Sequence, residues 1–111
     1  MTTNAASIRE MSPVWIDTDF AGFIIGWHPA GPALVGYSAQ HMKQRDLALV
    51  FIADRPQRDV LKRAMQMPVD FDAVIRPRDH RGVRVRCRIE PSPVGSASFS
   101  SLRWTFTSLA D

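Results

Sequence analysis

Residues 83–90 alternate strictly between apolar and charged side chains, and no other feature constrains the fold as strongly. The apolar side chains of this segment are Val83, Val85, Cys87 and Ile89, and the intervening residues are three arginines and a glutamate. Alternation over eight residues is typical of a strand with one buried face, because successive side chains point to opposite sides. Residues 69–76 alternate in a similar way, and a turn at residues 77–82 separates the two segments. The two segments are therefore predicted to form an antiparallel hairpin.

The charges of this hairpin indicate its register. If its centre lies near residues 79–80, Asp72 lies opposite Arg86 and Asp70 lies opposite Arg88. Pairs of opposite charge across two strands contribute about 0.2–1 kcal/mol each. The row of arginines could instead hold a phosphate, a nucleic-acid backbone or an acidic partner. We favour the cross-strand pairs, because they require no ligand.

Two short apolar segments near the start of the chain predict a second hairpin. Residues 14–16 and 23–27 flank a turn that has Asp17 at one end and Gly22 at the other. The second strand is apolar on both sides, so we expect both of its faces to be buried. One face can pack on the helices of the domain. The other needs the N-terminal segment or a second subunit.

Three helical segments are predicted between these hairpins. A short helix over residues 29–36 would begin at Pro29 and stop at Gly36. One or two further turns, over residues 38–44, would follow Ser38 as their cap.

The longest predicted helix covers residues 54–67. Asp54 would be its N-cap, and Pro68 would end it. Its apolar stripe would consist of Val60, Leu61, Ala64 and Met65. A last alternating strand is predicted over residues 102–107. Strands at both ends and helices between them give an α+β fold.

Several local motifs resemble those of PAS domains. Residues 19–24, Asp-Phe-Ala-Gly-Phe-Ile, are similar to the Asp-x-x-Gly-x-Ile hairpin of that family. Residues 34–38, Leu-Val-Gly-Tyr-Ser, resemble its Leu-x-Gly-Tyr-Ser segment. Asp54-Arg55 is similar to the Asp-Arg pair that opens the longest helix of the family. The resemblance extends over about residues 13–108.

The resemblance implies a five-stranded antiparallel sheet with short helices and one longer helix on one face. It assigns residues 13–109 to a PAS-like domain and leaves residues 1–12 as a flexible or short helical N-terminal cap. It also implies a sensory or regulatory signalling module that binds a small molecule, mediates dimerisation, or does both. The module would regulate a kinase, a cyclase or a transcription regulator, in cis or in trans. The alternatives are a ligand-free interaction module of the same fold and, third, a small enzyme.

The resemblance also suggests an interface. The first two strands and the last strand adjoin in a PAS sheet, so their outward apolar side chains would form a patch. The candidate interface residues are Ile8, Met11, Phe23, Ile25 and Trp27. We expect the side chains of the strand to pack on the N-terminal pair or on a second copy of the chain. The second arrangement would make a homodimer.

The sequence offers no motif for catalysis or for a metal. It has no Gly-x-Ser-x-Gly elbow and no phosphate-binding glycine loop, so we expect no enzymatic activity. Its histidines, His28, His41 and His80, are not spaced as metal ligands. His28 is expected to cap the following helix. In PAS relatives that bind haem, the axial histidine generally lies on the longest helix, and residues 54–67 contain none, so the resemblance does not favour haem. A flavin adduct is not expected either, because Cys87 lies in a predicted strand among valines and not near the central helices. The cofactor, if any, is not identified by the sequence.

Composition limits the location and the partners. A single cysteine excludes an intramolecular disulfide, and the longest apolar runs are too short to cross a bilayer. We therefore expect a cytoplasmic protein that does not enter a membrane. The net charge of +3 is too small an excess to indicate nucleic-acid binding.

Overall fold

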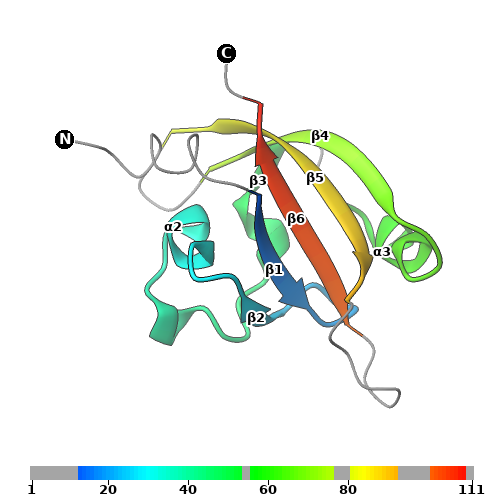
Figure 1. The fold of residues 1–111 in the computed structure, drawn as a ribbon, viewed down its shortest axis with the longest axis horizontal. Coiled ribbons are helices and arrows are strands. Elements are labelled where there is room, and N and C mark those ends of the chain that lie inside the picture. Colours follow the sequence, from blue (N-terminus) through cyan, green and yellow to red (C-terminus); the bar gives the residue numbers. More distant parts are fainter. Residues whose placement is uncertain (1–12, 54–55, 77–80, 93–100, 110–111) are drawn as a thin grey trace.

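The computed structural model describes residues 13–53, 56–76, 81–92 and 101–109. Within these residues, six strands form one antiparallel sheet in the order β2-β1-β6-β5-β4-β3. The strands are β1 (Val14–Thr18), β2 (Ile24–Trp27), β3 (Phe51–Ala53), β4 (Val69–Ile75), β5 (Val83–Pro91) and β6 (Leu102–Ser108). The α-helices are α2 (Gly31–Val35) and α3 (Arg58–Ala64), and the 3-10 helices are η1 (Ala39–His41) and η2 (Leu47–Val50). Figure 1 shows the curled sheet, with α2 next to β1 and α3 beside the β4–β5 end. The predicted α+β class is confirmed.

The β4–β5 hairpin has the predicted register. Asp72 pairs with Arg86 and Asp70 pairs with Arg88 in the ladder of the two strands. The alternation also has the predicted meaning, since Val85, Cys87 and Ile89 are all fully buried. The turn between the strands includes residues 77–80, which lie outside the described residues.

The sixth strand, β3, was not predicted. Residues 47–53 are an apolar run without alternation, and they divide into η2 and the three-residue strand β3. Asp46 starts η2, because its Oδ1 accepts a hydrogen bond from the Ala48 N–H at 3.0 Å. The strand count of five was therefore wrong by one short edge strand. A segment with no period of its own gave no signal for the change from helix to strand.

Strand β2 is buried on one of its two faces. Ile24 is fully buried, but the side chain of Ile25 is 42% exposed. One face of the strand is therefore buried within the chain, and the predicted cover of the other face by the N-terminal segment or by a second subunit stays a prediction. A register shift in the β1–β2 ladder interrupts the alternation of the strand at this point. The outer edge of β2 is covered, because the Ile24 N–H donates to Arg45 O at 2.8 Å and the Gln44 N–H donates to Ile24 O at 2.8 Å.

The helices are shorter than the sequence suggested. Helix α3 begins at Arg58 after Gln57 as its N-cap, and it ends at Ala64. The predicted cap, Asp54, lies outside the described residues. Gln57 has an extended backbone, with φ of −91° and ψ of 167°, so the helix starts only at Arg58. The C-terminal end also falls short, and Met65, assigned to the apolar stripe, is 42% exposed.

Helix α2 begins two residues later than predicted, at Gly31, with Ala30 as its N-cap. Its stop was predicted correctly, because Gly36 adopts the left-handed conformation with φ of 87° and its N–H bonds to Pro32 O. The predicted turn after Ser38 is the 3-10 helix η1.

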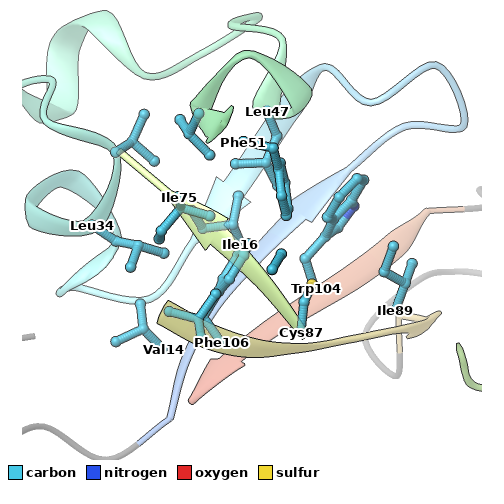
Figure 2. Close-up of a cluster of buried hydrophobic side chains, with 14 of the residues drawn as sticks. Val14, Ile16, Leu34, Leu47, Phe51, Ile75, Cys87, Ile89, Trp104 and Phe106 are labelled. Atoms are coloured by element: carbon cyan, nitrogen blue, oxygen red, sulfur yellow. The ribbon is translucent and has the colours of Figure 1, made fainter. Parts of the chain in front are cut away.

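The space between the helices and the sheet is filled by aromatic and aliphatic side chains. Phe51 is central, with its ring centroid 6.1 Å from that of Phe71, 5.9 Å from that of Trp104 and 6.1 Å from that of Phe106. Figure 2 shows Phe51, Trp104 and Phe106 together with aliphatic side chains that β1, α2, β4 and β5 contribute. The core therefore joins every layer of the fold and positions the surfaces described next.

Candidate functional site

The face of the sheet that points away from the core, called the open face below, is charged. Arg86 Nε lies 2.9 Å from Asp72 Oδ1, and Arg88 Nε lies 3.8 Å from Asp70 Oδ1. The hydrogen bond from Arg86 holds the pKa of Asp72 below its ordinary value. All four side chains are about half exposed. These arginines already have carboxylate partners, as predicted, and are not a vacant anion site.

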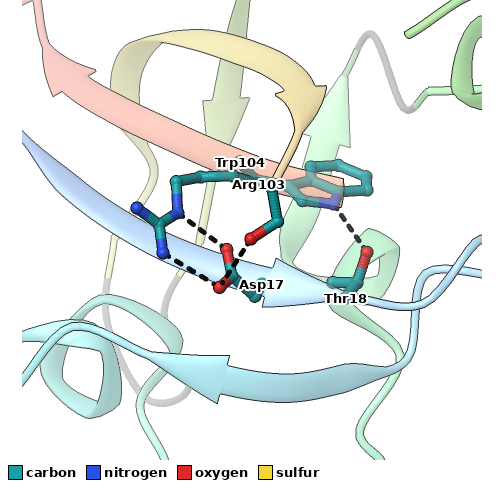
Figure 3. Close-up of polar contacts among 5 residues, drawn as sticks. Asp17, Thr18, Arg103 and Trp104 are labelled. Carbon is teal, nitrogen blue, oxygen red and sulfur yellow. Dashed lines mark hydrogen bonds and ion pairs between the residues drawn. The ribbon is translucent and has the colours of Figure 1, made fainter. Parts of the chain in front are cut away.

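A second polar cluster lies between β1 and β6 on the same face (Figure 3). Arg103 donates two hydrogen bonds to Asp17, from Nε to Oδ1 at 2.9 Å and from Nη2 to Oδ2 at 3.0 Å. The side chains are only 16% and 13% exposed. The Arg103 guanidinium also stacks on the ring of Trp15, 3.9 Å from its centroid. The hydrogen bond to Asp17, more than any other contact, raises the pKa of Arg103. Arg103 and Asp17 therefore form a largely buried ion pair with a structural role on the open face.

The apolar side chains expected at an interface lie in two different places. Phe23 and Ile25 are each 42% exposed, and Phe20, in the same β1–β2 hairpin, is 37% exposed. We call Phe20, Phe23 and Ile25 the hairpin patch. Trp27, in contrast, lies opposite Ile16 in the ladder and packs against the core. Ile8 and Met11 lie outside the described residues.

A groove of about 810 Å³ opens beside β3, and we call it the arginine groove. Its lining includes the buried side chains Val35, Val50 and Phe51. Two further lining residues are apolar and exposed, Leu49 at 68% and Ile52 at 56%. The apolar part of the groove is thus supplied by α2, η2 and β3.

The polar part of the arginine groove is mainly cationic. Of the residues that the structure describes, Arg45, Arg76 and Arg81 line it, with Tyr37 and the carboxylate of Asp46. The Arg45 guanidinium lies 4.5 Å from the centroid of the Tyr37 ring, and its Nε donates to His41 O at 3.0 Å. These contacts hold the Arg45 side chain in place. No ion pair joins the three arginines to a carboxylate within the described ranges.

The remaining candidate groups have structural roles where they are described. His28 Nδ1 accepts a hydrogen bond from the Ala30 N–H at 3.0 Å, but Ala30 is the N-cap of α2 and the helix has no side-chain cap, so the predicted capping role of His28 is wrong. The helix begins two residues later than predicted, and His28 therefore bonds the turn before it. His41 Nδ1 lies 2.8 Å from Ser38 Oγ. His80 lies outside the described residues. Cys87 is fully buried, and burial raises the pKa of its thiol.

The described part of the chain contains neither a cluster of metal ligands nor a membrane-spanning helix. Three or more His, Cys, Asp or Glu side chains nowhere gather in a way that could hold a metal ion. No helix in that part has the length and apolar character needed to span a bilayer.

The sequence analysis missed the arginine groove. Its arginines come from the segment that covers β2, from the end of β4 and from the start of β5. They share no motif and no period, so no local pattern could have associated them. Their one common signal is that they are absent from the cross-strand pairs that explain Arg86 and Arg88.

Comparison with solved structures identifies the fold. The chain is similar to the PAS domain of nitrogen regulation protein NR(II) from Vibrio parahaemolyticus, with a TM-score of 0.71, 15% identity, and coverage of 98% of this chain and 100% of that one. It is also similar to the PAS domain of an HTR-like protein from Haloarcula marismortui, with a TM-score of 0.71, 11% identity, and coverage of 95% and 93%. A domain of a sensory box sensor histidine kinase/response regulator from Geobacter sulfurreducens gives a TM-score of 0.67, 15% identity, and coverage of 92% and 88%.

No family model matches the sequence, and no curated protein sequence matches it. The likeness is therefore one of structure. It confirms the resemblance inferred from the local motifs, and the chain has the PAS fold.

Proposed function

We propose that this PAS-fold chain is a sensory signalling module that binds a small molecule in the arginine groove and has no catalytic activity of its own. The observation that carries the proposal is the groove itself, whose volume of about 810 Å³ lies in the range of small-molecule sites, roughly 300–1,000 Å³. Its mixture of apolar walls and a few polar groups is also typical of such sites. The likeness to domains of sensor histidine kinases supports a signalling role by analogy.

The groove is suited to transmit occupancy because one of its residues is connected to the edge of the sheet. The side chain of Arg45 lines the groove, while its backbone oxygen accepts the Ile24 N–H of β2. A ligand bound to the positioned Arg45 side chain would therefore stabilise the segment that pairs with the β1–β2 hairpin. That hairpin carries the hairpin patch, so ligand binding and association could be coupled there.

The second part of the proposal is a homodimer. The exposure of Phe23 and Ile25 supports it, since large apolar side chains grouped on one hairpin are a feature of interaction sites. Ile8 and Met11 remain proposed members of the interface, and Trp27 would support it from the core side. The effector would be a kinase, a cyclase or a transcription regulator, in cis or in trans, in the cytoplasm.

Native mass spectrometry of the freshly purified protein tests both parts. A mass above that of the polypeptide, lost on denaturation, is the expected sign of a bound small molecule. A species of twice the chain mass is expected for the dimer and should disappear in a Phe23→Ser, Ile25→Ser variant. Met65→Ser with Met67→Ser, at exposed positions outside both the hairpin patch and the arginine groove, is the matched control and should remain dimeric.

Two results would contradict the proposal. If the mass is bare and no compound of a metabolite library raises the melting temperature, small-molecule sensing is refuted. A bare dimer would then favour the ligand-free interaction module. A monomer at all concentrations would refute the homodimer.

A further inference from the structure

We infer that the arginine groove selects an organic anion with an apolar body, and specifically a carboxylate with an aliphatic chain. This inference rests on the proposed ligand-binding function and names its chemical class. It follows from the gathering of three arginines in one concavity, the contacts that position one of them, and the apolar wall beside them.

The charge of the groove is unbalanced. Among the described residues, the lining contains three guanidinium groups, those of Arg45, Arg76 and Arg81, and one carboxylate, that of Asp46, so this part of the lining carries a net charge of +2. Asp46 Oδ1 is already used, because it accepts the Ala48 N–H that starts η2. Like charges gathered in one concavity repel each other and attract an anion.

The arginines of the open face offer a comparison. Arg86, Arg88 and Arg103 each lie within 4 Å of a carboxylate oxygen, at 2.9, 3.8 and 2.9 Å. Among the described residues, the groove arginines form no such pair. Arg84, on the same face and opposite Val74, forms no such pair within the described ranges, so pairing alone does not distinguish the groove. What distinguishes the groove arginines is that three of them line one concavity.

Arg45 is oriented for this task. Its Nε donates to His41 O at 3.0 Å, and its guanidinium stacks on Tyr37, so the plane of the group is fixed. A planar guanidinium held in this way can bind both oxygens of a carboxylate through parallel N–H donors. A guanidinium group that is already positioned loses less conformational entropy on binding than a mobile one.

The apolar wall of the groove favours an aliphatic chain on the ligand. Leu49 and Ile52 expose more than half of their surface beside the arginines, and Val50 and Phe51 lie behind them. An inorganic anion would leave these side chains in water. An aliphatic chain attached to the carboxylate would cover them, and removal of apolar surface from water favours binding.

The test uses three probes on the intact chain: sodium octanoate, 1-octanol and sodium acetate. Isothermal titration calorimetry measures each affinity, and backbone amide shifts in NMR locate the site. We expect octanoate to bind at least about tenfold more tightly than octanol or acetate, as expected for losing one charge-assisted contact or the apolar contact. The shifted amides should belong to residues 45–52, 76 and 81. Raising the salt concentration from 0.05 to 0.5 M should weaken octanoate binding, as screening requires.

Matched variants separate the groove from the overall charge. Arg76→Gln with Arg81→Gln should weaken octanoate binding at least about tenfold. Arg58→Gln with Arg63→Gln removes the same charge from exposed positions on α3 and should leave octanoate binding unchanged. Ile52→Ser should weaken octanoate and leave the weak binding of acetate as it was. Circular dichroism of each variant verifies that its fold is retained.

The inference is overturned if octanoate does not bind, if octanol binds as tightly as octanoate, or if the α3 variant loses as much affinity as the groove variant. A neutral or cationic ligand found in the groove by native mass spectrometry would also overturn it, while the proposed sensory function would stand. Absence of any ligand would refute both.

Discussion

The hydrogen bond between Thr18 and Trp104 gives the sharpest test of the structure. Trp104 Nε1–H donates to Thr18 Oγ1 at 2.8 Å, and both residues are fully buried (Figure 3). The two residues are diagonal neighbours, because Thr18 lies opposite Leu102 in the β1–β6 ladder. Thr18→Val keeps the shape of the side chain and removes this acceptor. The indole N–H would then be buried without a partner.

The expected loss of stability is about 1–3 kcal/mol, the cost of leaving one buried donor unsatisfied. Loss of the second hydrogen bond of the Thr18 hydroxyl adds little to this loss of stability. Thr18 Oγ1 also donates to Asp19 O at 2.8 Å, but that oxygen accepts the Gly22 N–H at 3.1 Å as well and keeps a partner in the variant. For a domain of this size, each 1 kcal/mol lowers the melting temperature by roughly 4–8 °C.

Urea denaturation followed by far-UV circular dichroism measures the free energy of unfolding. The control is a double-mutant cycle with Trp104→Phe, which removes the N–H donor and leaves an aromatic ring in place. In that background Thr18→Val should cost less by about 1 kcal/mol or more, since no donor is left unsatisfied. An equal cost in both backgrounds would refute the assignment of the lost stability to this hydrogen bond.

Three further predictions follow from the sheet. The Cys87 thiol, whose pKa is raised by burial, should resist an aromatic disulfide reagent at pH 8 in the native protein and react promptly in urea; rapid native labelling would contradict its burial. Arg103→Lys keeps a positive charge but loses the two-point contact with Asp17 and the stacking, so it should lower the free energy of unfolding by about 1–2 kcal/mol, whereas Arg88→Lys at a 3.8 Å exposed pair should change it little. Arg86 lowers the pKa of native Asp72 below 3.8, so their interaction stabilises the fold above about pH 4 and is lost as the pH falls through the lowered pKa. The difference in unfolding free energy between wild type and Arg86→Gln should therefore shrink with acidification. NMR titration should give Asp72 a higher pKa in the variant than in wild type.

The sheet was predicted best where a sequence period coincided with charge. The alternation from Val83 to Glu90 identified a strand with one buried face, and its charges placed Asp72 opposite Arg86. A slip of one residue would turn every apolar side chain of the strand toward water. The sequence therefore determines this register strongly, and the structure agrees with it.

Prediction failed where the chain has no period. The run that contains Val50 and Phe51 is apolar throughout, so it did not reveal the point at which a 3-10 helix becomes the edge strand β3. The predicted helix over residues 54–67 is too long, because the composition allows a helix to Met67 while α3 ends at Ala64. Boundaries depend on which side chains the rest of the fold can bury, and propensity alone does not contain that information.

The sequence alone determined the α+β class, the succession of most strands along the chain, the register of the β4–β5 hairpin and the burial of Cys87. These features depend on alternation, on turn residues and on charges that are close along the chain. Only the tertiary structure decided that Trp27 faces the core while Ile25 stays exposed, because a register shift in the β1–β2 ladder interrupts the alternation. Only the tertiary structure brought Arg45, Arg76 and Arg81 into one groove. These arginines are far apart in the sequence and come together only when the sheet curls. No local sequence pattern therefore reveals that they are neighbours.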